Sequence, residues 1–449
     1  MSRSGAFLLA SLLVLPALAQ EPETHRVTAQ IATATTRPET EPVLSLSDVI
    51  SEALDKNPAV QSALHAVEAQ KHKIPQAKSL PDPEASVGWM GNLTPFSVQE
   101  GDPSSYRGIG VMQSIPYPGK LKLRGDIASQ EVQMAQWDYE AVRRRVEADV
   151  KAAYYEYFFY DKALEITRKN KDLLQKLSGV SEARYRVGKA MQQDVLKSQV
   201  EISLLLQKIT VLEQQRSTAQ ARLNTLMSRP PDSALPPAAN VEPAALNEPL
   251  DALYAAAKGQ DPGLQRELST VKRNQFSTEL ARKDYRPDFA VAYMFEQRPM
   301  MPDMSGMTFT VNVPVFYKTK QREQVKQAQE EVISAERSRD NRANEVQFEL
   351  KQQYLAAQAA KQLLDLYTKA VVPQASLALE SSMSAYEVGN VDFLTMLANF
   401  TTVLNYEVDY YRELADYQTA LARMEPLVGI ELTSAKPPDS GATAAKQKE

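Results

Sequence analysis

Few residues of this sequence have side chains that could do chemistry, and those few are scattered. The chain has no cysteine, which excludes disulfides and thiolate metal sites. Its three histidines, His25, His65 and His72, are too far apart to form a catalytic or metal cluster, and a solvated pair is the simpler interpretation of the last two. The sequence also lacks a phosphate-binding glycine loop and a nucleophile elbow. We therefore predict that the protein is not an enzyme and uses no cofactor.

One methionine-rich segment has side chains that could bind a soft metal ion. Residues 298–307 contain four thioethers, at Met300, Met301, Met304 and Met307. Thioethers select soft ions such as Cu(I), so this segment is a candidate exit site for copper or silver. Adaptable packing of a loop by flexible methionines is the alternative, and it is the interpretation that we favour.

Two aspartates follow two similar turn motifs. The motif Tyr-x-Val-Gly occurs at 185–188 and again at 386–389, so the second glycine lies 201 positions after the first. Glycine permits the positive φ that a chain needs to leave a helix and reverse, and each motif therefore predicts a turn between two helices. Asp194 lies six residues after the first glycine, and Asp392 lies three residues after the second. A solvated charge on the flank of a coiled coil is the alternative interpretation of either acid.

These turns belong to very long helical hairpins. Residues 119–229 contain no proline, and beyond the first turn the core-facing positions recur in steps of three and four that average 3.5. This is the period of a left-handed coiled coil. Ser198 and Arg216 interrupt its apolar seam. The two arms would be roughly 100 Å and 60 Å long, which is too long for an ordinary globular core.

The whole plan occurs twice, so the chain is a tandem duplication. Asp261-Pro262 and Asp288 match Asn57-Pro58 and Glu84 at an offset of 204, and Lys318 matches Lys120 at an offset of 198. The start of the chain resembles a secretory signal, with an early arginine, an apolar stretch and a small-x-small cleavage site. The predicted order is a signal peptide at 1–19, a disordered lead-in at 20–43, a first repeat at 44–228, a proline-rich connector at 229–249, a second repeat at 250–430 and a disordered tail at 431–449. Within the repeats, helical hairpins are predicted at 119–228, turning at Gly188, and at 318–428, turning at Gly389 with a bend at Pro373.

Each repeat also contains two strands with one apolar face. Apolar and polar residues alternate at 83–91, 108–116, 287–296 and 307–316. Strands of this length suit a membrane barrel, and the secretory start favours it over the alternative of a small soluble sheet packed on helices. Four strands cannot close a barrel, since the smallest have eight, so the chain must oligomerise. The expected lipid-facing residues are Val87, Trp89, Val111, Phe289, Val291, Tyr293, Phe309, Val311 and Val313.

With these features the chain resembles the TolC-like outer membrane factor family over about residues 44–430. The resemblance rests on the secretory start, the duplicated helix-strand-strand-helix-helix plan, the two Tyr-x-Val-Gly turns and the segment Pro116-Tyr-Pro-Gly-Lys120. That segment is most similar to the branch serving heavy-metal efflux pumps. The fold class is therefore expected to be mainly α with a small membrane β part.

The resemblance implies an assembly and a location. It implies a homotrimer with a twelve-stranded barrel in the outer membrane of a Gram-negative bacterium and a twelve-helix tunnel through the periplasm. Its partners would be a periplasmic adaptor, an inner-membrane pump of the resistance-nodulation-division type and outer membrane lipid. The residues implied for adaptor docking are Tyr185, Val187, Gly188, Tyr386, Val388 and Gly389, and those implied for the aperture are Asp194 and Asp392.

The aperture departs from the family pattern in two places. The second copy has Thr395 where an acid is typical, and neither copy has an arginine two places after the turn glycine, because those positions hold Ala190 and Val391. These departures put the salt-bridged latch of better-known gates in doubt.

The resulting hypothesis is a passive trimeric duct that carries metal cations or drugs out of the periplasm. A type I secretion exit duct and a non-channel coiled-coil scaffold are the alternatives, and a secreted binding module lacks a cluster of convergent polar groups. The net charge of -5 argues against nucleic acid as a partner.

Overall fold

The computed structural model describes residues 43–92 and 97–433. The chain divides into two units, residues 1–41 and 42–449, and only the second contains described residues. The predicted signal peptide, nearly all of the predicted lead-in and residues 434–449 of the predicted tail lie outside the described residues. The described part is mostly helical with one small sheet, which confirms the predicted fold class. None of the described helices has an apolar stretch that would span a lipid bilayer.

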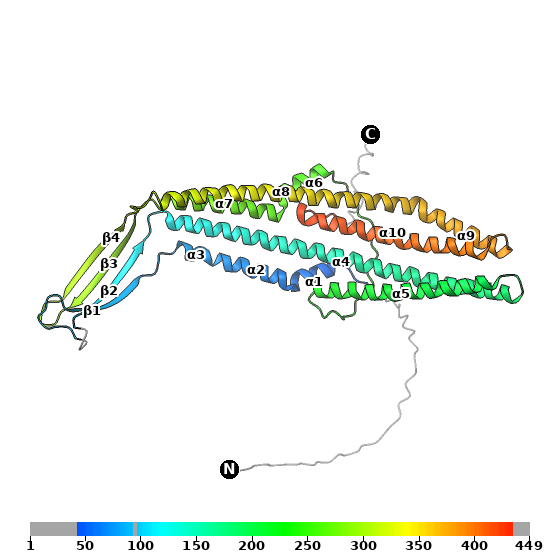
Figure 1. The fold of residues 1–449 in the computed structure, drawn as a ribbon, viewed down its shortest axis with the longest axis horizontal. Helices are drawn as coiled ribbons and strands as arrows, with labels where there is room; N and C mark the ends of the chain where they lie inside the picture. The colour runs from blue at the N-terminus through cyan, green and yellow to red at the C-terminus, as the bar shows by residue number, and fades with distance from the viewer. Residues whose placement is uncertain (1–42, 93–96, 434–449) are drawn as a thin grey trace, which may run out of the picture. The chain divides into compact units, whose positions relative to one another are not determined.

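The first repeat leads from short helices through two strands into a long helical hairpin (Figure 1). Its longest helix has 67 residues, and the chain reverses direction after this helix at the turn that contains Gly188. Its elements are α1 (Leu46–Lys56), α2 (Pro58–Lys71), α3 (Lys73–Lys78), β1 (Glu84–Met90), β2 (Tyr106–Ile115), α4 (Lys120–Arg186) and α5 (Gln192–Leu226).

The second repeat follows the same plan with one displaced strand. Its elements are α6 (Leu250–Gln260), α7 (Pro262–Lys283), β3 (Asp288–Gln297), β4 (Met304–Asn312), α8 (Gln321–Leu366), the π-helical turn η1 (Tyr367–Val371), α9 (Val372–Val388) and α10 (Phe393–Val428). Strand β4 begins and ends earlier than the predicted 307–316. Pro314 has no N–H to donate to a neighbouring strand, and beyond it the chain turns towards α8.

The turn η1 lies directly before Pro373, where the sequence predicts a bend. A proline inside a helix removes one hydrogen bond, and its ring clashes with the carbonyl four residues earlier. Here the N–H of Val372 bonds to the carbonyl oxygen of Tyr367, five residues earlier. The wider π turn thus accommodates the proline, and the helix continues as α9 instead of ending.

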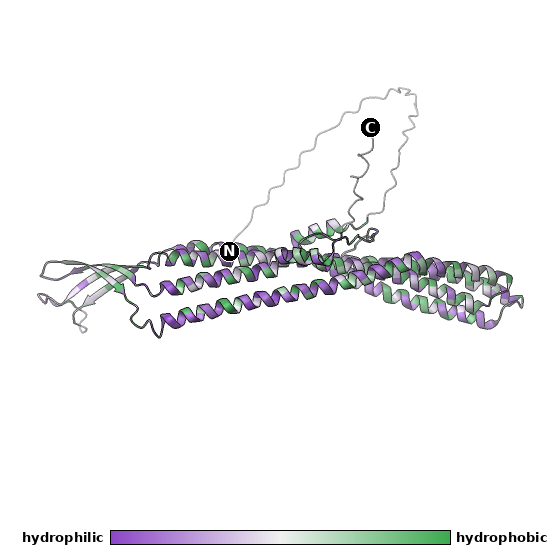
Figure 2. Ribbon diagram, turned by 90° about the horizontal axis from the view of Figure 1, so that it is seen from above, coloured by the Kyte–Doolittle hydropathy of each residue, from purple (hydrophilic) through white to green (hydrophobic). Residues whose placement is uncertain are grey.

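The helices lie side by side in a fixed order. Near the two turns the order is α5, α4, α10 and α9, and nearer the sheet it is α2, α4, α7 and α8. Figure 2 shows hydrophobic and hydrophilic residues alternating along the long helices, as expected for helices that bury one face. Helix α2 meets the end of α5, where the Asn57 amide donates a 3.0 Å hydrogen bond to the Leu226 carbonyl oxygen. Asn57 also caps α2, accepting from the Ala59 N–H at 2.9 Å.

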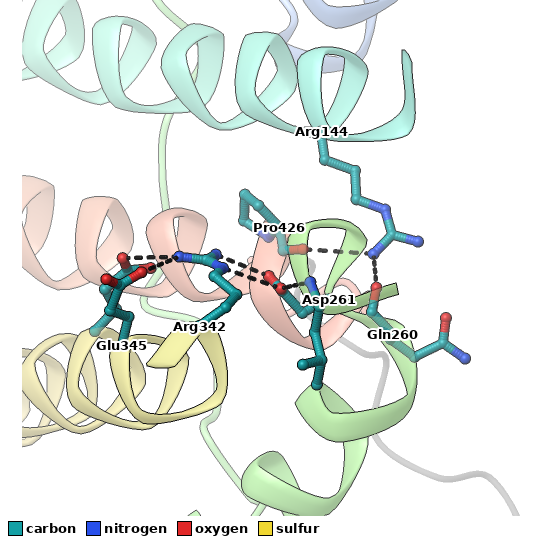
Figure 3. Close-up of polar contacts among 8 residues, drawn as sticks. Arg144, Gln260, Asp261, Arg342, Glu345 and Pro426 are labelled. Atoms are coloured by element: carbon teal, nitrogen blue, oxygen red, sulfur yellow. Dashed lines mark hydrogen bonds and ion pairs between the residues drawn. The ribbon is translucent and has the colours of Figure 1, made fainter. Parts of the chain in front are cut away.

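Two arginines at equivalent positions of the repeats hold the junction of α6, α7 and α10 (Figure 3). Arg144 of α4 donates to the carbonyl oxygens of Gln260, at 2.8 Å, and Pro426, at 3.4 Å. Arg342 of α8 pairs with Asp261 at 3.1 Å, and Asp261 caps α7. Asp261 is nearly fully buried, so the arginine compensates a charge that would otherwise be costly to bury.

The polar residues that interrupt the coiled-coil seam have partners within the first hairpin. The hydroxyl of Ser198 lies 2.7 Å from that of Ser178. Arg216 binds Asp161 and donates to the Tyr157 hydroxyl at 2.6 Å. Burial raises the pKa of Tyr157 to about 12, so this hydroxyl stays protonated. These contacts satisfy the buried polar groups and fix the register of α5 on α4.

Candidate functional site

The described strands form one antiparallel sheet in the order β1-β2-β3-β4, away from the hairpin turns (Figure 1). Every residue of β4 is exposed, and so is every residue of β1 except Trp89, which is partly exposed. Within the described part of the chain, no helix covers either face. A soluble antiparallel sheet would normally bury one face against its own core. This sheet therefore needs another environment for its apolar side chains.

Strand register gathers the apolar residues on one face, because directly opposed residues point to the same side. All the predicted lipid-facing residues within the strands lie there, Trp89 included, and Val313 lies one residue beyond β4. Four more large apolar residues lie on this face, although the list of predicted lipid-facing residues omitted them: Ile109, Ile115, Phe295 and Met307. The rows of the apolar face are Val87, Ile109, Phe295 and Ser305; then Ala85, Val111, Tyr293 and Met307; then Gln113, Val291 and Phe309; and last Ile115, Phe289 and Val311.

The opposite face consists mainly of small and polar residues. One row is Ser86, Gly110, Met294 and Gly306, and another is Ser114, Ala290 and Thr310. A membrane barrel needs this division, with an apolar band towards lipid and a polar surface towards water.

Both edges of the sheet are open. Among the described strands β1 pairs only with β2, and β4 pairs only with β3, so each outer strand presents unpaired backbone N–H and C=O groups. The outer helices expose apolar side chains as well, namely Leu196, Val200, Leu204 and Val211 on α5 and Phe348, Leu355, Leu366 and Leu377 on α8 and α9. The two edges of one chain are different surfaces. Contact between copies would thus be head-to-tail, which closes into a ring when the rotation allows it.

The first predicted tip lies where α4 turns into α5. Gly188 has a φ of 73°, and a Cβ atom there would meet open space. Strain in the backbone, not a clash, therefore opposes a larger residue. Val187 and Met191 are 67% and 72% exposed, and Tyr185 is 43% exposed. This turn presents an apolar surface that a partner could contact.

The second predicted tip is built differently around its tyrosine. Gly389 has a φ of 85°, and Val388 is 72% exposed, as in the first turn. Tyr386, however, is only 5% exposed, and its hydroxyl lies 3.0 Å from that of Ser181 in the first hairpin. Arg184 donates to the carbonyl oxygens of Tyr386, at 2.7 Å, and of its neighbour in sequence. Tyr386 thus joins the two hairpins, and of the six predicted docking residues it is the one least available to a partner.

The two predicted aperture acids have local roles at helix starts. The carboxylate of Asp194 accepts from the Met191 N–H at 3.3 Å, at the start of α5. Asp392 caps α10, accepting from both the N–H and the hydroxyl of Thr395. The hydrogen bond from the hydroxyl lowers the pKa of Asp392. Both acids lie beside the turns and stabilise a helix N-terminus, and their role at an aperture stays a prediction.

The methionine segment does not form one cluster. Met304 and Met307 lie within β4, three residues apart, opposite Glu296 and Tyr293 respectively, so they lie on opposite faces of the sheet. Met300 is 85% exposed in the turn before the strand. Nor do the described residues include a group of three or more His, Cys, Asp or Glu that could hold a metal ion. This placement does not bring the four thioethers together, and a role in metal binding stays a prediction.

Comparisons with known proteins identify relatives of this architecture. Residues 49–229 match the family model of the outer membrane efflux protein. The outer membrane protein VceC from Vibrio cholerae is 16% identical, with a TM-score of 0.71 over 85% of this chain and 96% of VceC. The CmeC outer membrane channel of Campylobacter jejuni is 13% identical, with a TM-score of 0.73 over 94% of this chain and 96% of CmeC. The open MtrE outer membrane channel of Neisseria gonorrhoeae is 14% identical, with a TM-score of 0.72 over 87% of this chain and 91% of MtrE.

A search of curated protein sequences finds no match to this chain. At these identities the solved structures show a shared fold over both repeats, whereas the family model matches the first repeat. The family model describes outer membrane efflux proteins and the solved neighbours are outer membrane proteins, which agrees with the predicted class and location. Assignment to the heavy-metal branch stays a prediction.

Proposed function

We propose that this chain is an outer membrane efflux protein and that three copies join into a passive duct from the periplasm to the exterior. Three sheets of four strands would close a twelve-stranded barrel, and the helices would continue it as a tunnel. The observation that carries this proposal is the uncovered sheet, with one continuous apolar face, one polar face and two open edges. In such a barrel the apolar face would contact lipid, the polar face would contact water, and the two edges would pair with neighbouring copies.

We further propose that a periplasmic adaptor docks at the two turns and that an inner-membrane pump supplies the energy. The exposed apolar side chains of Val187, Met191 and Val388 support a docking surface there. Metal cations and drugs remain the candidate cargo. A type I secretion exit duct is the alternative, since it would use the same barrel and tunnel. The uncovered sheet disfavours a non-channel scaffold.

The assembly can be tested directly. Protein extracted from outer membranes should migrate as a trimer in SDS until boiled, and it should give discrete conductance steps in planar bilayers. A monomer without conductance would contradict the proposal.

The aperture acids can be tested in the same bilayers, because rings of carboxylates favour cations. Replacing Asp194 and Asp392 together by Asn should shift the reversal potential in a salt gradient towards lower cation selectivity. An unchanged reversal potential would show that neither acid lines the aperture.

A further inference from the structure

A buried lysine joins the two repeats where the sheet meets the helices. Lys120, the first residue of α4, is 3% exposed. Its Nζ lies 3.0 Å from the carboxylates of both Asp284 and Asp288. Asp288 also accepts a 2.7 Å hydrogen bond from the backbone N–H of Tyr117. Through these contacts the β2–α4 segment of the first repeat is fastened to the α7–β3 segment of the second.

Because the plan is duplicated, a residue equivalent to Lys120 lies at one free edge of the chain, and a residue equivalent to Asp288 lies at the other. Lys318, between β4 and α8, occupies the position equivalent to Lys120, at an offset of 198. Glu84, the first residue of β1, occupies the position equivalent to Asp288, at an offset of 204. Both residues are exposed, and among the described residues neither has an ion-pair partner. A lysine and a carboxylate thus stand unpaired at opposite edges.

We propose that Lys318 of one copy forms an ion pair with Glu84 of the next copy and so joins the subunits. The inference rests on the proposed trimer. In a head-to-tail ring the β4–α8 edge of one copy meets the α2–β1 edge of the next, just as β2–α4 meets α7–β3 within one chain. The contact made by Lys120 therefore serves as a template for the contact between subunits.

The contact proposed between copies reproduces only part of the contact that Lys120 makes within one chain. The position equivalent to Asp284 holds Leu80, which is 50% exposed, so Lys318 meets one carboxylate where Lys120 meets two. The strands at the same junction agree with the pairing, because Val311 of β4 and Val87 of β1 both belong to the apolar face. The apolar band consequently continues across the subunit boundary.

Charge reversal tests the pair. In Lys318→Glu or Glu84→Lys alone, two like charges meet in the interface, and we expect the dissociated fraction of the SDS-resistant trimer to rise about tenfold. The double variant restores opposite charges and should recover the wild-type fraction. Lys320→Glu makes the same change of charge two residues further along and should leave the trimer intact. Single variants as stable as the wild type, or a double variant that does not recover, would overturn the pairing.

Crosslinking gives an independent measurement, because the natural sequence has no cysteine. With Glu84→Cys and Lys318→Cys in one chain, a short bifunctional thiol reagent should produce covalent dimers and trimers, and neither single variant should produce any. A wild-type protein that forms no trimer would overturn both the proposed function and this pair. A wild-type trimer without crosslinks or charge rescue would overturn the pair alone.

Discussion

The apolar face of the sheet predicts a graded response to arginine along β4. Phe309, which is 71% exposed, lies in the third of four apolar rows, and Val311, which is 51% exposed, lies in the row nearest the helices. On the lipid face of a barrel, arginine costs about 2–4 kcal/mol at the bilayer midplane and about 0–1 kcal/mol near the interfaces. Two residues along a strand tilted by about 40° change the depth by roughly 5 Å. We therefore expect Phe309→Arg to cost about 2–4 kcal/mol per copy and Val311→Arg to cost less.

The matched control lies between these two residues. Thr310 stands opposite Ala290 on the polar face, so Thr310→Arg should face water and leave the trimer yield near that of the wild type. The measurements are the amount of trimer in the outer membrane fraction and urea unfolding of the protein folded in lipid vesicles. Thr310→Arg should instead change the single-channel conductance. An equal loss of trimer in Phe309→Arg and Thr310→Arg would refute the assignment of the two faces.

Three further changes test the tips and the helical region. Gly389→Val strains a backbone at a φ of 85°, and we expect it to preserve secretion and trimer formation yet abolish efflux, measured as resistance in a host without its own duct. Arg184→Met removes the two hydrogen bonds to the second hairpin and should raise single-channel conductance, whereas Arg186→Met, at a side chain 73% exposed, should not. The hydrogen bond from Arg229 lowers the pKa of Glu52 from 4.5 to about 2. A carboxyl whose pKa falls on folding stabilises the protein above its unfolded pKa and loses this contribution as the pH falls towards 2, so thermal unfolding should show that loss, and Glu52→Gln should remove it.

Local and periodic features of the sequence were sufficient to predict much of the fold. The positive φ of Gly188 and Gly389 follows from the need to reverse a helix, and the caps at Asn57 and Asp261 follow from a polar residue placed before proline. The apolar face of the sheet follows from alternation alone, because side chains in a strand have a period of two residues.

Contacts between distant segments could not be predicted in the same way. Lys151 and Glu425 look like ordinary surface charges, yet Lys151 is 1% exposed and its Nζ lies 2.5 Å from the Glu425 carboxylate. The other oxygen of that carboxylate accepts from the backbone N–H of Leu432 at 2.8 Å. This arrangement depends on how α4, α10 and the chain beyond α10 meet, and no local pattern records it.

The two tyrosines of the repeated turn motif show why identical motifs acquire different roles. Tyr185 is 43% exposed and Tyr386 is 5% exposed, because Arg184 and Ser181 of the first hairpin cover the second tyrosine. The position equivalent to Arg184 in the second repeat holds Ala385, whose methyl group could not make these contacts with a neighbouring copy in the proposed trimer. The turns are therefore fastened strongly within a chain and lack the same fastening between chains.

The same inequality recurs beside the sheet, where Lys120 meets two carboxylates within the chain and Lys318 is left to meet one from a neighbour. Contacts across the boundary between the two repeats form within one chain, so they do not depend on the concentration of a second copy. In the proposed trimer the boundary between copies occurs three times in a closed ring, so each of its contacts is made three times. The Lys120 ion pairs lie inside the chain, and we expect substitutions at the open edges to affect assembly without preventing folding.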